Sequence, residues 1–236
     1  MNKDYLPACC APLSEHWPLP HALPAVRLIN TRFDPARLND EDFSRCAIEP
    51  IKGIAKRQSE YLAGRLCARE ALRQLSGVAL TPGMGEDRTP QWPDGTLGSI
   101  THGSGWAAAV VGNRSDWFGL GLDVERIMPA KRAERLAKEI LTPAELLRLE
   151  RLPIEQRAPR ISLTFSLKES LFKALYPALR KHFYFQDAEL LSVAAGNRVS
   201  MRLLLDLHAE WPAGSELQGQ FAEFEGYVLS LVSIPR

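Results

Sequence analysis

The chain has 236 residues, of which 45% are hydrophobic and 24% are charged. This balance is typical of a globular protein long enough to bury a substantial core. Its 29 Lys and Arg residues nearly equal its 28 Asp and Glu residues, so no overall charge draws it to nucleic acid or to an anionic membrane. No segment approaches the ~20 apolar residues of a membrane span, and the N-terminal residues lack the apolar run of a signal peptide. We therefore expect a cytoplasmic protein that binds neither nucleic acid nor membrane.

The four cysteines form no recognisable zinc or redox motif, because none of them has a partner at C-x-x-C spacing. A chain of this length also does not need disulfides to fold. We predict free thiols at Cys9, Cys10, Cys46 and Cys67.

The first half of the chain predicts one helix followed by a strand meander. Leucines recur at helical spacing over residues 57–75, and Gly77 marks the expected end of this helix. A loop rich in Gly and Pro follows over residues 81–95. Three strand candidates come next: residues 98–102, 106–112 and 117–125.

The second half predicts the same order of elements. Thr142 as N-cap, Pro143 at N1 and Glu145 at N3 form a capping box, which opens a helix that ends near residue 151. A further helix is predicted over residues 163–176 and is expected to end before Pro177. Three strand candidates follow: residues 199–205, 216–224 and 227–233.

Because the order of helix and then strands occurs twice, the sequence predicts an α/β (α+β) fold with two pseudo-symmetric halves. Each half is expected to pack a helix on a small, mainly antiparallel sheet, with the halves dividing the chain into residues 1–120 and 121–236. The join then falls on the third strand candidate, which is a natural place for a cleft.

Two acidic residues end the strand candidate over residues 117–125. Alternation places Asp123 and Glu125 on the same face as Gly119 and Gly121. Two glycines in line suggest that something approaches the backbone closely. Like charges about 7 Å apart on one strand face repel unless a cation lies between them, and carboxylate oxygens suit Mg²⁺. The alternative is a solvent-facing strand end with incidental acids.

A mostly buried helix with one polar arc is predicted around residues 165–173. Apolar residues cover more than half of its circumference, and Glu169 and Lys173 lie one turn apart on the polar arc. This arc is expected to face a cleft or another charged surface, although an exposed i,i+4 ion pair is the simpler alternative. Lys168 falls inside the apolar arc, where its ammonium must reach an anion.

Two further features are candidates for phosphate contact. His102 ends a strand candidate beside the turn that holds Gly103 and Gly105, so its imidazole and the loop N–H groups suit a phosphate. A structural histidine at a hairpin turn is the alternative. Basic residues also recur along the first predicted helix, either as solvated surface or as phosphate ligands; they are Lys56, Arg57, Arg65, Arg69 and Arg73, the last three at a spacing of four.

Together these segments resemble the Sfp-type 4′-phosphopantetheinyl transferases, particularly the EntD-like branch and its pseudomonad relatives. The strongest matches are G-[LI]-D-x-E at residues 121–125 and F-S-x-K-E-S-x-x-K at residues 165–173, separated by about forty residues as in the family. Weaker matches lie at residues 61–65, 92–95 and 98–102. In the last of these, Thr101 stands where Ser is more usual and retains the hydroxyl.

The resemblance implies a magnesium site. Asp123, Glu125 and Glu169 are expected to hold Mg²⁺ together with the diphosphate of coenzyme A, in an active site at the interface of the two halves. The first half is expected to bind coenzyme A, and the second to carry the metal site and the docking surface for the partner.

Coenzyme A is the implied co-substrate. The resemblance implies that its phosphates contact His102, Lys168 and Lys173, with Arg57 as a further candidate. The implied reaction transfers 4′-phosphopantetheine to a serine of an apo acyl or peptidyl carrier protein and releases adenosine 3′,5′-bisphosphate. Glu169 is expected to remove the serine proton, directly or through water, and Lys173 to stabilise the leaving group.

Carrier proteins present an acidic helix beside their modified serine, and the basic segment over residues 128–138 is the expected docking surface. A monomer is expected, because both halves lie in one chain. Two alternatives stay open. One is another Mg²⁺-dependent phosphoryl-transfer or nucleotide-hydrolysing enzyme, although a Walker-type phosphate loop is absent. The other is a non-catalytic binding relative that keeps the fold.

Overall fold

The computed structural model describes residues 5–236 and divides the chain into two compact units. The first unit holds the chain up to Trp17 together with Ala22–Asp116, and the second holds Pro18–His21 together with Trp117–Arg236. The expected division after residue 120 would cut the strand β6 (Trp117–Arg126), which lies entirely in the second unit. The structure therefore moves this boundary to the turn before β6.

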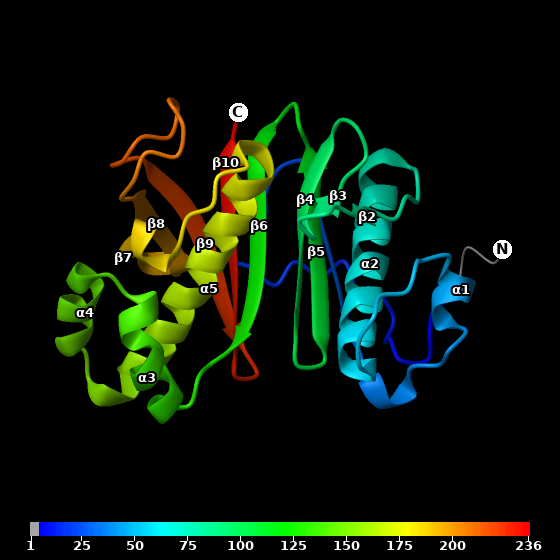
Figure 1. Cartoon of the computed structure of the whole chain (residues 1–236), viewed down its shortest axis with the longest axis horizontal. Coiled ribbons are helices and arrows are strands. Elements are labelled where there is room, and N and C mark those ends of the chain that lie inside the picture. The colour runs from blue at the N-terminus through cyan, green and yellow to red at the C-terminus, as the bar shows by residue number, and fades with distance from the viewer. Residues whose placement is uncertain (1–4) are drawn as a thin grey trace. The chain divides into compact units, whose positions relative to one another are not determined.

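The first unit packs a long helix on a three-stranded antiparallel sheet (Figure 1). The sheet has the order β1-β5-β4, and α2 contacts all three strands. The main elements are β1 (Val26–Arg32), α2 (Ala55–Ser76), β4 (Thr96–Gly103) and β5 (Trp106–Asn113). The shorter ones are η1 (Pro35–Arg37), α1 (Asp42–Cys46), β2 (Gly83–Met84) and β3 (Pro90–Gln91).

The second unit packs helices on a five-stranded antiparallel sheet of order β6-β10-β9-β8-β7. Figure 1 shows α5 running along the sheet, and its main contacts are with β6 and β10. The helices are α3 (Ala130–Ile140), α4 (Pro143–Glu150) and α5 (Ile154–Leu179), with η2 (Phe185–Asp187) and η3 (Ala195–Asn197). The strands after β6 are β7 (Ala188–Val193), β8 (Arg198–Leu203), β9 (Glu216–Phe224) and β10 (Tyr227–Pro235).

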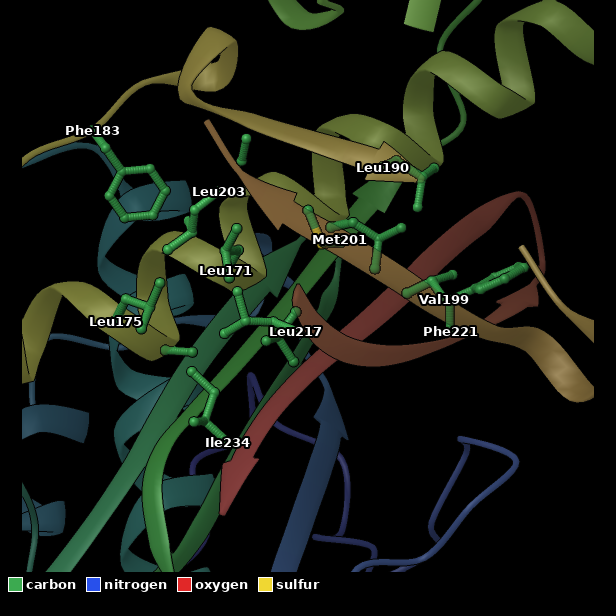
Figure 2. Close-up of a cluster of buried hydrophobic side chains, with 14 of the residues drawn as sticks. Leu171, Leu175, Phe183, Leu190, Val199, Met201, Leu203, Leu217, Phe221 and Ile234 are labelled. Atoms are coloured by element: carbon green, nitrogen blue, oxygen red, sulfur yellow. The ribbon is translucent and has the colours of Figure 1, made fainter. Parts of the chain in front are cut away.

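The core of the second unit lies between α5 and the middle of the sheet. Leu171 and Leu175 of α5 pack against Met201 and Leu203 of β8, and all four are fully buried (Figure 2). Fully burying an aliphatic side chain of this size contributes about 1.5–3 kcal/mol relative to leaving it exposed. The apolar arc of the helix therefore binds α5 firmly to the sheet and leaves its polar arc to other contacts.

The predicted fold class is confirmed, since each unit packs helices on an antiparallel sheet. The six predicted strands correspond to β4, β5, β6, β8, β9 and β10. The predicted end of α2 is also confirmed: Gly77 is left-handed with φ 78°, and its N–H donates to the Arg73 carbonyl. None of the helices described in residues 5–236 has the length and apolar character needed to cross a membrane.

One prediction about the second unit is corrected, and one strand of that unit was missed. α5 begins at Ile154 and continues past Pro177, because packing of its apolar arc outweighs the lost backbone hydrogen bonds at its two prolines. The strand β7 was not predicted, since Ala, Glu and Leu favour a helix in isolation. Pairing with β8 overrides that local preference.

Candidate active site

The strand β6 and the helix α5 approach each other very closely. A Cβ atom at Gly121 would lie 1.8 Å from the Ser170 carbonyl oxygen, and one at Gly119 would lie 2.2 Å from the Ala174 carbonyl oxygen. Any side chain at these positions would push the helix away from the strand. The expected close approach to the backbone is therefore confirmed, and the approaching group is the backbone of α5.

Buried serine hydroxyls fix the setting of α5 against the sheet. Ser166 Oγ and Ser170 Oγ each lie 2.8 Å from Ser230 Oγ on β10. Ser166 Oγ also donates to the Asp123 carbonyl at 3.3 Å. Rotating the helix would break these buried hydrogen bonds, which is costly. The polar arc of α5 is therefore held beside the end of β6.

Asp123 lies at the centre of this region, with its side chain only 6% exposed. Lys173 Nζ donates to Asp123 Oδ1 at 2.7 Å and to the Leu122 carbonyl at 3.2 Å. Asp123 Oδ2 is buried and has no hydrogen-bond partner among residues 5–236. A solvent-facing strand end is thus excluded for Asp123, and the ion pair of Lys173 is made with this residue rather than with Glu169.

Glu125 and Glu169 lie close enough to Asp123 for the three charges to interact. Burial and the charge of Asp123 raise the pKa of Glu125 to about 7, and Glu169 adds to the shift. Burial and the charge of Asp123 likewise raise the pKa of Glu169, while Lys173 opposes both shifts. We call Asp123, Glu125 and Glu169 the acidic cluster. Among the described residues, only the Lys173 ammonium is paired with this cluster, so the three carboxylates leave an excess of negative charge that a further cation would balance.

The acidic cluster is not a closed ligand set. Within the part of the chain that the structure describes, no three His, Cys, Asp or Glu side chains are grouped so as to hold a metal ion. The donor chemistry nevertheless fits a hard divalent cation, because the unpartnered atom is a buried carboxylate oxygen and the neighbouring groups are carboxylates.

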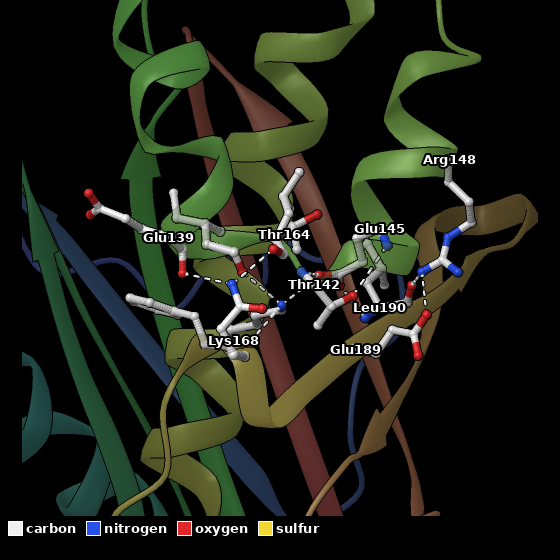
Figure 3. Close-up of polar contacts among 12 residues, drawn as sticks. Glu139, Thr142, Glu145, Arg148, Thr164, Lys168, Glu189 and Leu190 are labelled. Carbon is white, nitrogen blue, oxygen red and sulfur yellow. Dashed lines mark hydrogen bonds and ion pairs between the residues drawn. The ribbon is translucent and has the colours of Figure 1, made fainter.

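Lys168 is the buried lysine of α5, and its ammonium donates only to groups of the fold itself (Figure 3). The side chain is 2% exposed, and Nζ donates to Glu145 Oε2 at 2.6 Å. It also donates to the carbonyls of Ile140 and Phe185, each at 2.8 Å. Burial lowers the pKa of this ammonium, which Glu145 opposes. All three donors have acceptors, so the prediction that Lys168 binds coenzyme A is corrected: the anion it reaches is Glu145.

Glu145 completes the same network. Its Oε2 also accepts from Thr142 N at 2.7 Å, and its Oε1 accepts from Leu190 N at 2.6 Å (Figure 3). Thr142 Oγ1 accepts from Glu145 N at 3.2 Å, so the predicted capping box is confirmed. We call the pair Lys168 and Glu145, with these partners, the buried network. It ties α4 and β7 to α5, one residue before Glu169.

In the first unit, the structure brings together two of the predicted phosphate contacts. Arg57 Nη1 lies 3.0 Å from His102 Nε2, although 45 residues separate them. Glu60 Oε2 lies 3.6 Å from His102 Nδ1 and 3.8 Å from Arg57 Nη1. Because Arg57 can only donate, Nε2 accepts and the ring proton lies on Nδ1, toward Glu60. Two cationic or polar donors therefore share one carboxylate.

Arg65 is the buried member of the basic residues on α2. It is 4% exposed, and its Nε has no hydrogen-bond partner among the described residues. Its Nη2 donates to the Gly83 carbonyl at 3.1 Å, and its guanidinium lies over the Tyr61 ring. Arg69 and Arg73, by contrast, bind the Cys46 carbonyl and Glu70. Spacing alone does not separate the buried Arg65 from the half-buried Arg69 and the exposed Arg73.

A cavity of about 260 Å³ opens beside Glu169. Its walls are aromatic: the ring of Phe172 stacks on Tyr176 and also contacts His182 and Phe183. The segment over residues 182–185 supplies much of the lining. Sequence reasoning missed this segment, because it has neither a motif nor a period.

Comparison with known proteins finds two family models in the chain. The model described as the 4′-phosphopantetheinyl transferase N-terminal domain matches residues 49–112. The model described as the 4′-phosphopantetheinyl transferase superfamily matches residues 119–232. The second match contains the acidic cluster and all of α5.

Similar proteins extend over most of the chain. Enterobactin synthase component D from Salmonella typhimurium is 33% identical over 225 residues, which cover 94% of this chain and 91% of that protein. The 4′-phosphopantetheinyl transferase PptT from Mycobacterium tuberculosis is 33% identical over 190 residues, 77% of this chain and 81% of that protein. The 4′-phosphopantetheinyl transferase Svp from Streptomyces mobaraensis is 32% identical over 209 residues, 81% and 78% respectively. Consistent with its motifs, the chain belongs to the 4′-phosphopantetheinyl transferase superfamily.

Proposed function

We propose that this transferase works at the acidic cluster of β6 and α5. It moves the 4′-phosphopantetheine group of coenzyme A to a serine of an apo acyl or peptidyl carrier protein and releases adenosine 3′,5′-bisphosphate. The observation that carries the proposal is the charge imbalance at Asp123, whose Oδ2 is buried without a partner beside two carboxylates of raised pKa.

Asp123, Glu125 and Glu169 are the proposed ligands of Mg²⁺. When bound, the ion supplies Lewis-acid polarisation and charge neutralisation for the diphosphate of coenzyme A. The raised pKa values of Glu125 and Glu169 support this role, because they reflect carboxylates that lack sufficient positive charge nearby.

Glu169 is the proposed acceptor of the serine proton. Burial raises the pKa of Glu169 above its usual value, the direction that suits a general base. The serine oxygen forms a bond to the β-phosphorus, the bond from that phosphorus to the leaving bisphosphate oxygen breaks, and the proton moves to Glu169 directly or through water. Lys173 offsets the charge that develops on the leaving group.

Two sets of residues are the proposed contacts of coenzyme A. In the first unit, Arg57, His102 and the buried Arg65 are proposed phosphate contacts, because each can donate a hydrogen bond and the Nε of Arg65 has no partner among the described residues. The aromatic cavity beside Glu169 takes the uncharged pantetheine arm.

The helix α3 is the proposed docking surface for the carrier. Lys131, Arg135 and Lys138 are exposed and follow one another at spacings of four and three, so they share one face. Such a face complements an acidic helix. A monomer in the cytoplasm is proposed, and the four cysteines, all of which are free as predicted, fit a reducing compartment.

The direct test is incubation of the chain with coenzyme A, Mg²⁺ and a panel of apo carriers, followed by intact mass measurement. A mass gain of one phosphopantetheine on a carrier, with release of adenosine 3′,5′-bisphosphate, supports the proposal. Cleavage of coenzyme A or of a nucleotide without a mass gain on any carrier supports the hydrolase alternative instead.

A further inference from the structure

Lys173 holds a position that a divalent cation would be expected to take. Its ammonium lies 2.7 Å from Asp123 Oδ1, while the other oxygen of this carboxylate is buried and has no hydrogen-bond partner among residues 5–236. Its charge also opposes the rise in the pKa of both glutamates of the acidic cluster. One monovalent side chain thus acts on all three proposed metal ligands.

We propose that Lys173 is an exchangeable stand-in for the divalent ion. In the metal-free chain it holds the Asp123 carboxylate. It gives up this carboxylate when the ion binds, and its ammonium then becomes available to the diphosphate of coenzyme A. This inference rests on the proposed metal site and adds a competition between the ion and a residue of the chain itself.

The contacts of Lys173 suit such an exchange. Its side chain is 29% exposed, whereas that of Asp123 is 6% exposed and belongs to β6, where Asp123 pairs with Ser230 of β10. Its second contact, to the Leu122 carbonyl, is long at 3.2 Å. A long lysine stem with few partners can move, and a buried aspartate on a strand cannot. The mobile partner of this ion pair is therefore the lysine.

Charge counting supports the same conclusion. When all three carboxylates are ionised, they and the Lys173 ammonium carry two net negative charges, which a divalent ion would balance. If Lys173 kept its contact with Asp123 Oδ1, it would occupy one of the oxygens that the ion needs and would also repel it. Any ligand that excludes another from a shared group lowers its apparent affinity. Lys173 should therefore weaken ion binding in the absence of coenzyme A.

The test is the affinity of the full chain for Mn²⁺, a paramagnetic probe of hard oxygen sites, measured by electron paramagnetic resonance without coenzyme A. Lys173→Met should bind Mn²⁺ roughly tenfold more tightly than the wild type. The matched control is Arg132→Met, because Arg132 also acts on the charge of Glu125 but has no contact with Asp123. It should change the affinity less than about twofold.

A second measurement on the same variant, its affinity for coenzyme A, should change in the opposite direction. With Mn²⁺ present, Lys173→Met should bind coenzyme A roughly three- to tenfold more weakly, because the released ammonium is missing. A residue that served only the fold would not strengthen one ligand and weaken the other. Lys173→Gln provides both measurements if the methionine variant does not fold.

Three outcomes would overturn the exchange. One is Mn²⁺ binding by Lys173→Met that is no tighter than in the wild type, and another is an equal gain in Arg132→Met, which would mean long-range charge alone. In both cases the metal site itself would survive. If Mn²⁺ binds neither the wild type nor Lys173→Met more tightly than it binds Asp123→Asn, the proposed metal site fails together with the exchange.

Discussion

The two lysines of α5 have opposite environments although they lie less than two turns apart. Lys168 is buried in a network in which each of its donors has an acceptor and the Glu145 carboxylate is bound at both oxygens. Lys173 is part-exposed and pairs with Asp123, which keeps one oxygen unpartnered. The difference shows that a satisfied buried pair stabilises the fold, whereas an unsatisfied one beside further carboxylates indicates chemistry.

Replacing Lys168 tests the structural side of this comparison, and it should give the largest loss of stability. Lys168→Met leaves Glu145 buried without its counter-ion, so we expect the free energy of unfolding to fall by about 3 kcal/mol or more. Lys173→Met should cost less, about 1–2 kcal/mol, because Lys173 is 29% exposed and solvent screens its pair in part, although the variant leaves Asp123 without its counter-ion. Urea unfolding followed by circular dichroism measures both. Equal losses in the two variants would remove the distinction drawn between them.

A double variant sharpens the same point. Lys168→Met combined with Glu145→Gln removes both charges of the buried network, so part of the lost stability should return relative to Lys168→Met alone. No recovery would mean that the network acts through its shape and not through its charges.

A methyl group at Gly121 should lower both the stability of the fold and the transfer activity. Gly121→Ala places a Cβ 1.8 Å from the Ser170 carbonyl oxygen, so α5 must move away from β6 and we expect a loss of about 2–3 kcal/mol. Transfer activity should fall as well, because the polar arc of α5 moves with the helix. Gly214→Ala is an instructive control: nothing lies within 4 Å of that position, although its φ of 92° adds strain of its own. A Gly121→Ala protein with wild-type activity would contradict the close-packing account.

The acidic cluster should give the metal-free chain a distinctive pH dependence. The pKa of Glu125 is raised from 4.5 to about 7 in the folded chain. Between these values the folded chain binds more protons than the unfolded chain, so the free energy of unfolding falls as the pH rises and levels off above about 7. Discounted for the partial exposure of Glu125, the fall is about 1–2 kcal/mol.

This dependence is measured by urea unfolding in EDTA over a series of pH values, with Glu125→Gln as the comparison. The variant should lack most of the fall. A wild-type curve parallel to that of Glu125→Gln would show that Glu125 titrates near its usual pKa.

The smallest effect is expected away from Lys168 and Lys173, on the exposed face of α3. Reversing Lys131 and Arg135 to Glu should raise the KM for the carrier several-fold, since each exposed charge pair is worth about 0.2–1 kcal/mol. The KM for coenzyme A should stay unchanged. The effect should also shrink at high salt. Equal changes in both KM values would argue against docking at α3.

The sequence predicts where both lysines lie on the helix, but it does not predict what Lys168 binds. Alternation along β6 placed Asp123 and Glu125 on the face of the two glycines, and helical spacing placed Glu169 and Lys173 on one arc. Periodicity also put Lys168 inside the apolar arc, where an anion was required. It does not identify that anion, because Glu145 lies 23 residues away and reaches Lys168 only after α4 packs against α5.

Other parts of the molecule depend even more on tertiary structure. The aromatic lining over residues 182–185 follows no period, and β7 has the composition of a helix. Arg65 differs from Arg69 only in what covers it. These features arise from packing between segments distant in sequence, which local patterns do not encode.

The most direct test of the central claim is the mass of an apo carrier after incubation with coenzyme A, Mg²⁺ and Glu169→Gln. Glu223→Gln, the same change at an exposed position of β9, is the matched control. We expect the wild type and Glu223→Gln to load the carrier, and Glu169→Gln to be slower by about 10²-fold or more with its free energy of unfolding retained. Loading by Glu169→Gln at the wild-type rate would contradict a catalytic centre at the acidic cluster.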